Sequence, residues 1–521
     1  MQSRSSLFAS VLVMSALATP VLAGSFTASS PFIKDGSGRV VFLHGVNAVW
    51  KVKPYYPPSS AYQTGAVDPS QSFFDARDAK LLADNGLNCV RLGVLFAGVA
   101  PQPSPAFADP AYLEKIDELV ALLGSYGVSV LLDFHQDMYN ERFQGEGFPA
   151  WATHTEALAD QPIPGVGTVP FSTVTAPPDQ LSSFGFPLNY FTPPVMRAFD
   201  NLWLNNFGLW AGYADAWQAV AARFAGRDNV LGYDLLNEPW PGTLWETCAS
   251  PTGCPVFDTQ RLQPFSEYVI NAIRAADTTG IAFWEPDVTG DFGVANDVGL
   301  LTPIHDTANN NGISFHDYCL IGGTVPGVSR GSDPECQFAE PLAFQQQQMA
   351  AARNGSAMLL TEFGASDDLT DIGRVAALAD QNMVGWTYWH YANFTDVTGN
   401  PGAESLFTTD DLGRFNADGS ANLKSGKADL LIRTYPQAVA GTPKSFAFDP
   451  TTGRFTLTFT PDPSITAPTV IFVPARHYPN GYTVAVTGNA TQIASGNAQL
   501  VEIQNPSSGS GDVTVTITRN P

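Results

Sequence analysis

Short runs of apolar residues alternate along the chain with longer segments in which apolar residues recur at helical spacing. The helical spacing is clear in residues 112–120, 213–224 and 262–276, which we predict to be amphipathic helices. Eight apolar runs have the composition of buried parallel strands: residues 40–48, 87–94, 128–137, 230–238, 281–286, 312–319, 357–364 and 383–391. Eight alternating strand and helix units predict an α/β fold, a (β/α)8 TIM barrel that spans residues 30–435.

The pattern changes to strict alternation after residue 436. Apolar and polar positions alternate with a period of two in residues 445–448, 454–459, 483–486 and 513–517, and turn sequences such as Asp449-Pro450 lie between these segments. Such alternation is typical of antiparallel strands with one buried face. We therefore predict that residues 436–521 form a C-terminal all-β sandwich domain.

One long insertion, residues 138–195, separates the third predicted strand from the helix before the fourth. It has no periodicity but carries eight aromatic side chains: Phe143, Phe148, Trp151, Phe171, Phe184, Phe186, Tyr190 and Phe191. A loop of this length inside a compact domain is usually functional or disordered, and the aromatic content favours an ordered loop. We predict that it either lines a binding site or packs on the barrel as a lid.

The first 23 residues have the features of a cleaved signal peptide. Arg4 is followed by an apolar segment at residues 7–18 and by Val21-Leu22-Ala23 before the expected cleavage point. No later segment reaches the roughly 18 apolar residues that a membrane-spanning helix needs. These features predict a secreted, extracellular protein without an integral membrane span. The formal net charge of −23 gives no attraction for nucleic acid, which is not expected as a partner.

Five cysteines are present, and export would allow them to form disulfides. Cys248 and Cys254 flank a short loop with proline and glycine, and we predict that they pair. Cys319 and Cys336 flank a glycine-rich loop and form the second candidate pair. Cys89 lies inside an apolar run, which favours a buried free thiol. No spacing resembles a zinc site, so no metal ion is expected.

Two of the apolar runs end abruptly in a glutamate. They are Leu235-Leu236-Asn237-Glu238 and Leu359-Leu360-Thr361-Glu362. The carboxyl ends of the strands form the active-site face of a (β/α)8 barrel, so both glutamates are expected there. Two carboxyl groups about 5–5.5 Å apart are the machinery of a retaining glycosidase. We predict that Glu238 is the acid/base and Glu362 the nucleophile, a mechanism that needs no metal and no cofactor.

These residues belong to a larger set that resembles the retaining glycosidases of glycoside hydrolase family 5. Members of that family carry eight characteristic residues at the ends of the barrel strands, and this chain has a match for each, in order: Arg91, His135, Asn237, Glu238, His316, Tyr318, Glu362 and Trp389. The resemblance covers most of residues 30–435. It implies the same barrel fold and the same two-glutamate chemistry.

The matching positions suggest a role for each side chain. Arg91 and Tyr318 can hydrogen-bond Glu362, and His316 can tune Glu238. The remaining positions are expected to bind the sugar: Asn237 at its 2-hydroxyl, His135 and Asp137 at other hydroxyls, Trp389 at its apolar face, and Lys51 and Lys53 at more distant sugars. Lys51 and Lys53 are equally well explained as solvated lysines. Glu285, at the end of the fifth predicted strand, is interpreted as structural or substrate-binding.

A closer resemblance is to the endoglycoceramidases, a subgroup of this family. It rests on the segments His44-Gly45-Val46-Asn47, Asp133-Phe134-His135-Gln136-Asp137-Met138-Tyr139 and Leu235-Leu236-Asn237-Glu238-Pro239-Trp240, and on the appended β-sandwich. The resemblance implies hydrolysis of the bond between oligosaccharide and ceramide in glycosphingolipids, with gangliosides and related neutral glycolipids as substrates. It also implies a monomer that has transient contact with lipid surfaces or micelles.

Three other functions remain open at this point. The chain could be an endoglucanase or another β-glycanase of the same family, or a hydrolase of glucosylceramide. It could also be an inactive protein that binds carbohydrate or lipid, although such a protein has no need for both Glu238 and Glu362. An apolar slot beside the acid would favour the glycolipid, because a ceramide has long alkyl chains and a polysaccharide does not.

Overall fold

The structure is a computed structural model that describes residues 22, 24–58, 73–103, 108–156, 186–250, 253–289, 302–318, 334–394, 396–509 and 511–521. The predicted signal peptide lies almost wholly outside these residues. So do Phe171 and Phe184 of the long insertion, and Cys319 of the second candidate disulfide. The predictions for these segments therefore stay predictions.

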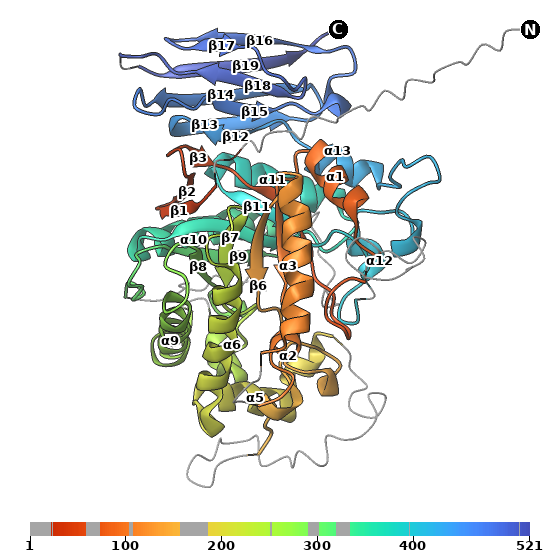
Figure 1. The fold of residues 1–521 in the computed structure, drawn as a ribbon, viewed down its shortest axis with the longest axis vertical. Coiled ribbons are helices and arrows are strands. Elements are labelled where there is room, and N and C mark those ends of the chain that lie inside the picture. The colour runs from red at the N-terminus through yellow and green to blue at the C-terminus, as the bar shows by residue number, and fades with distance from the viewer. Residues whose placement is uncertain are drawn as a thin grey trace, which may run out of the picture.

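Eight parallel strands close into a barrel, which confirms the predicted fold class (Figure 1). They are β4 (His44–Ala48), β5 (Cys89–Gly93), β6 (Ser129–Asp133), β7 (Val230–Asp234), β8 (Ile281–Trp284), β9 (Asn311–Asp317), β10 (Ala357–Phe363) and β11 (Gly385–Tyr388). Each predicted apolar run contains one barrel strand. The first run is divided, because β3 (Val40–Val41) pairs outside the barrel and only β4 enters it.

Helices cover the outside of the barrel. They are α1 (Ala76–Asp84), α2 (Phe96–Val99), α3 (Pro110–Ser125), α5 (Pro193–Trp203), α6 (Leu209–Phe224), α7 (Trp245–Cys248), α8 (Pro255–Phe257), α9 (Gln263–Arg274), α10 (Pro334–Asn354), α11 (Leu369–Asn382), α12 (Pro401–Glu404) and α13 (Ser425–Leu431). Helix α3 shows why they form where they do. The Asp109 side chain accepts the N–H of Ala111 at 2.9 Å, and Pro110 occupies the first turn, where its missing N–H costs nothing.

Shorter helical turns shape the loops between these elements. The 3-10 turns are Glu141–Phe143, Ala150–Ala152, Leu188–Phe191, Asn206–Gly208, Gly242–Leu244, Asp411–Gly413 and Ala475–His477, and residues Asp258–Leu262 form a π-helix before α9. Of the long insertion, residues 138–156 and 186–195 are described. Phe143, Phe148 and Tyr190 from these parts are buried in the barrel's hydrophobic core.

Two antiparallel sheets form the sandwich at one end of the barrel. One sheet has the order β13 (Gly441–Asp449), β14 (Arg454–Pro461), β19 (Val513–Arg519), β16 (Tyr482–Thr487). The other has the order β1 (Phe26–Ser29), β2 (Phe32–Asp35), β3, β12 (Tyr435–Val439), β15 (Thr469–Phe472), β18 (Leu500–Gln504), β17 (Thr491–Ile493). Alternate residues of both sheets meet in one core, as the period of two predicts. Strands β1–β3 precede the barrel in sequence, so this sheet takes strands from both ends of the chain.

The sandwich lies at the amino-terminal end of the barrel strands. Tyr435 of β12 stacks on His44, the first residue of β4, with ring centroids 3.7 Å apart. The opposite face, where the strands end, is therefore left to the long loops. Among the described residues, no helix is both long and apolar enough to cross a bilayer.

The cysteines agree with the sequence prediction as far as they are described. Cys248 and Cys254 form a disulfide whose Cα atoms are 4.4 Å apart. Cys336 is also in a disulfide, but its predicted partner Cys319 lies outside the described residues. Cys89 is a buried free thiol, and burial raises its pKa to about 12, so it is neither a nucleophile nor a metal ligand at neutral pH.

Candidate active site

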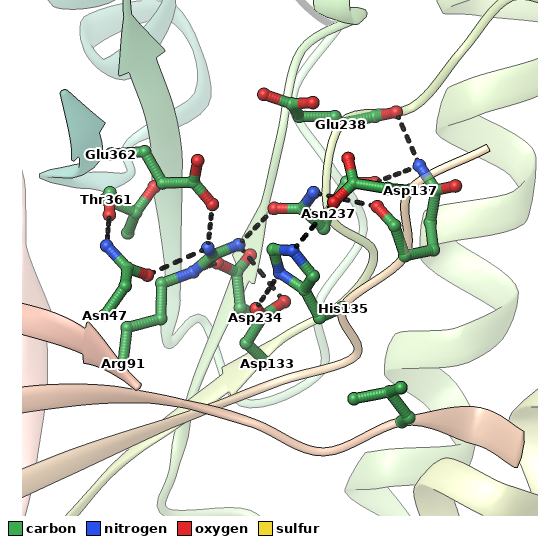
Figure 2. A network of polar contacts seen from close by, with 12 residues as sticks. Asn47, Arg91, Asp133, His135, Asp137, Asp234, Asn237, Glu238, Thr361 and Glu362 are labelled. Atoms are coloured by element: carbon green, nitrogen blue, oxygen red, sulfur yellow. Dashed lines mark hydrogen bonds and ion pairs between the residues drawn. The ribbon is translucent and has the colours of Figure 1, made fainter. Parts of the chain in front are cut away.

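A bulge in the barrel aims Glu362 into the site. Strand β10 follows β9 in register up to Leu360, and the register then shifts between Leu360 and Glu362. The extra residue, Thr361, is held by its carbonyl, which accepts hydrogen bonds from Asn47 Nδ2 at 2.7 Å and Thr387 Oγ1 at 2.5 Å. Bulges of this kind redirect a side chain at the rim of a barrel. Here the redirected side chain is the predicted nucleophile (Figure 2).

The Glu362 carboxylate accepts hydrogen bonds from the two side chains that the family resemblance assigns to it. Arg91 Nη1 lies 2.5 Å from Oε1, and the Tyr318 hydroxyl donates to Oε2 at 2.8 Å. A carboxylate with two such donors is fixed in orientation. Glu362 therefore meets the structural requirements of a nucleophile.

Arg91 is fully buried at the centre of a group of carboxylates. Besides Glu362 it contacts Asp133 at 3.1 Å, Asp234 at 2.8 Å and Glu285 at 2.9 Å. Burial alone would lower the pKa of Arg91, but the four carboxylates outweigh burial, so its pKa lies well above the ordinary value. Burial and the nearby carboxylates of Glu285 and Asp133 together raise the pKa of Asp234 to about 8, against the lowering effect of Arg91.

Glu238 faces Glu362 across a small gap. One carboxyl oxygen of each glutamate and one nitrogen of His316 all lie within 4.8 Å of one another. His316 Nδ1 is 2.9 Å from Glu238 Oε1. Burial raises the pKa of Glu238, and the charges of Glu362 and Asp137 raise it further, against the lowering effect of His316. A raised pKa favours the protonated form of Glu238, which is the form a general acid needs.

One end of the pocket is polar. His135 and Asp137 follow strand β6, and the His135 ring lies parallel to Trp389 with centroids 5.1 Å apart. His135 Nδ1 is 2.8 Å from Asp133. Burial would lower the pKa of His135, but Asp133 and Asp137 raise it to about 10. This end therefore presents an aromatic face, a cationic ring and a carboxylate, a combination that suits a sugar.

The two predicted lysines have different positions. Lys51 is buried at the polar end, where its ammonium lies 2.5 Å from Asp137 and 3.2 Å from Asp396 and sits 4.6 Å from the Trp389 ring centroid. Lys53 does not line the pocket, because its side chain is 69% exposed and pairs with Glu141 on the surface. Lys51 is thus a site residue, and the structure gives Lys53 no contact there.

The other end of the pocket is apolar and lies beside Glu238. The pocket encloses about 800 Å³ of open space. Its apolar wall on this side consists of Phe186, Pro187, Trp240 and Val288. Trp240 comes two residues after Glu238, and the Val288 N–H donates to the Pro239 carbonyl at 3.3 Å, so this wall is tied to the acid.

Several site residues were not predicted from the sequence. Asp396, Thr398 and Glu404 line the polar end; the first two come from the loop after β11, and Glu404 is the last residue of the short helix α12. Asp133 and Asp234 surround Arg91 together with Glu285, which the sequence had already indicated as structural or substrate-binding. Asp133 and Asp234 are the last residues of β6 and β7, so the signal of a carboxylate at a strand end could have found them as well.

Acidic clusters in the pocket could attract a cation, and Lys51 already supplies one. Besides the group that contains Glu238 and Glu362, two groups of described residues have ligand-like spacing: His135, Asp137 and Glu146, and His390, Asp396 and Glu404. The Lys51 ammonium contacts carboxylates of both groups. It would repel a metal ion at either position.

The pattern of strand-end residues, barrel and sandwich agrees with two family models. Residues 69–395 match the model of cellulase (glycosyl hydrolase family 5), and residues 433–517 match the glycoside hydrolase family 5 C-terminal domain. The chain belongs to glycoside hydrolase family 5.

Endoglycoceramidases are among the similar proteins. The chain is 33% identical to endoglycoceramidase I of Rhodococcus hoagii (strain 103S) over 512 residues, which cover 96% of this chain and 89% of that protein. Endo-glycoceramidase II from Rhodococcus sp. is similar in structure. Its ganglioside GM3 complex has a TM-score of 0.70 at 28% identity and covers 94% of this chain and 99% of that one. Its lactosyl-enzyme intermediate has a TM-score of 0.69 at 28% identity and covers 94% and 100%.

Proposed function

We propose that this glycosidase hydrolyses the β-glycosidic bond between the oligosaccharide and the ceramide of glycosphingolipids, and that it releases intact glycan and ceramide. One observation carries the proposal. The pocket has a polar, aromatic end and an apolar end, and Glu238 and Glu362 lie where the two meet. A glycolipid has the same division, with its scissile bond at the boundary.

The geometry fits a double displacement with retention of configuration. Glu362 attacks the anomeric carbon while Glu238 gives its proton to the departing ceramide oxygen, and a glycosyl–Glu362 ester forms. Glu238, now a carboxylate, takes a proton from water, which attacks the same carbon, displaces Glu362 and restores the β configuration. One carboxyl oxygen of each glutamate lies within 4.8 Å of one oxygen of the other, which fits the short spacing of retaining enzymes.

The relatives support this choice of substrate over a polysaccharide. The two relatives described above are named endoglycoceramidases, and the structures of one of them include a ganglioside complex and a lactosyl-enzyme intermediate. A β-glycanase would need hydroxyl-binding groups on the acid's side of the pocket. In the part of the chain that the structure describes, this side carries Trp240, Val288 and Phe186 instead.

The rim of the apolar end offers a contact for a lipid surface. Leu188 and Phe191 stand on one 3-10 turn directly after Phe186, with 40% and 37% of their surfaces exposed. Phe191 packs on Trp240 and Trp245, so the exposed patch is continuous with the pocket wall. We propose that the secreted protein acts as a monomer and that this rim makes transient contact with a micelle or bilayer while the ceramide enters.

Product analysis tests the proposal. The purified protein is incubated with a panel of gangliosides, neutral glycosphingolipids, glucosylceramide and carboxymethylcellulose, and the products are identified by mass spectrometry. Intact oligosaccharide together with intact ceramide is the expected result. Release of single sugars from the glycan end, or cleavage of carboxymethylcellulose at a comparable rate, would contradict it.

A further inference from the structure

Glu285 follows strand β8 and points both of its carboxyl oxygens at the catalytic machinery. Oε2 accepts the backbone N–H of Glu238 at 2.7 Å. Oε1 lies 2.9 Å from Arg91 Nη2 and 3.5 Å from His316 Nε2. The side chain is almost completely buried, with 3% of its surface exposed. A buried charge is retained only when it is paired, and two partners of this one, Arg91 and His316, contact Glu362 and Glu238 respectively. The Ser314 hydroxyl adds a longer contact to Oε1 at 3.5 Å.

The backbone at Glu238 needs such a partner. Glu238 has φ of 45°, in the left-handed region that residues with a side chain rarely adopt. The conformation costs on the order of 1–3 kcal/mol and persists only where the surroundings fix it. Glu285 fixes the N–H of this residue, while Gln136 Nε2 donates to its carbonyl at 3.2 Å. Hydrogen bonds therefore hold both the backbone N–H and the backbone carbonyl of Glu238, and the acceptor of the N–H is the buried carboxylate of Glu285.

Glu285 also acts on the side chain of the acid. The His316 ring stands between two carboxylates, with Nδ1 2.9 Å from Glu238 and Nε2 3.5 Å from Glu285. A carboxylate on the far nitrogen orients an imidazole and favours its protonated form. Glu285 thus reaches Glu238 by two routes, through its main chain and through His316.

We propose that Glu285 is a positioning residue for the acid/base, which holds Glu238 where the leaving ceramide oxygen can receive its proton. Glu285 touches neither the sugar nor the reacting atoms and does not line the pocket. Its effect is confined to steps in which Glu238 moves a proton. It contacts Arg91 as well, but Arg91 keeps Asp133, Asp234 and Glu362 without it. The nucleophile should therefore remain in place when Glu285 is replaced.

Comparison of two leaving groups tests the proposal. A dinitrophenyl β-lactoside departs without protonation, and kcat/KM reports only the steps up to glycosyl transfer, so its value does not depend on the acid. A displacement of a catalytic group by about 1 Å costs on the order of 100-fold. Glu285→Ala is accordingly expected to lower kcat/KM for a glycosphingolipid about 100-fold and to change that for the dinitrophenyl lactoside less than about threefold. Glu285→Gln should show the same selectivity with a smaller loss.

Asp234→Asn is the matched control, because Asp234 is equally buried and equally bonded to Arg91 but contacts neither Glu238 nor His316. Any loss in this variant should affect both substrates alike. The fraction of competent sites is counted from the mass increase with a 2-fluoro lactosyl inactivator, and rates are expressed per competent site. If Glu285→Ala has no competent sites, the same comparison of the two substrates with Glu285→Gln tests the proposal. Equal loss on both substrates, or no loss on the glycolipid, would overturn the proposal.

Discussion

Replacement of Phe186 by Ser tests whether the apolar wall binds the ceramide. Phe186 lines the pocket, packs on Tyr190 with ring centroids 6.5 Å apart, and remains partly exposed in the free protein. Complete burial of a phenylalanine is worth about 1.5–3 kcal/mol. Roughly half of that is left for the ligand to supply, about 1 kcal/mol, which corresponds to roughly a fivefold change in affinity. Phe186→Ser should therefore raise KM for a glycosphingolipid about fivefold.

The assay compares the glycosphingolipid with a soluble aryl lactoside. The lactoside has no alkyl chain that could lose its contact, so its KM should change less than about twofold. Phe338→Ser is the control for loss of an exposed aromatic residue, because Phe338 is 76% exposed on α10 and does not line the pocket. An equal rise in KM for both substrates would refute the reasoning and would make residues around Phe186 a structural lid. We predict the same selective rise in KM for Phe184→Ser, a residue that lies outside the described part of the loop.

Four further outcomes are expected. Glu362→Ala and Glu238→Ala should each abolish turnover of a glycolipid. Only Glu238→Ala should keep the glycosylation step with a dinitrophenyl leaving group, which is measured as the burst of dinitrophenolate. Loss of the burst in both variants would contradict the assigned roles. NMR of the first-formed sugar should show the β anomer, and an α product would exclude the double displacement. Because the acid acts in its protonated form, kcat/KM should fall as the pH rises through the raised pKa of Glu238. His316 lowers that pKa, so His316→Asn should move the alkaline limb of the pH profile to higher pH. A shift of this limb to lower pH would refute the electrostatic argument. Excess chelator should leave activity unchanged, whereas a loss restored by one divalent ion would show that a metal takes part.

The sequence by itself determined the barrel and its two glutamates. Both rest on local signals, since an apolar run long enough for a strand and a carboxylate at its end are neighbours along the chain. The closed order of the strands then brings Glu238 and Glu362 together without any further information. One sheet of the β-sandwich, with strands β13, β14, β16 and β19, was equally accessible, because a period of two is visible within five or six residues.

Only the tertiary structure decided which polar residues share an environment. Lys51 and Lys53 are two positions apart, yet one is buried among three carboxylates and the other lies on the surface. The hydrogen-bond partners of Lys51 are 86 and 347 positions away, so no local pattern could separate the two lysines. Likewise, Val40–Val41 was predicted to be part of the first barrel strand, but β3 joins the distant β12 because that pairing covers the edge of the sandwich sheet. The contact of Glu285 with the backbone of Glu238 has the same origin. It forms only when two separate strands end side by side.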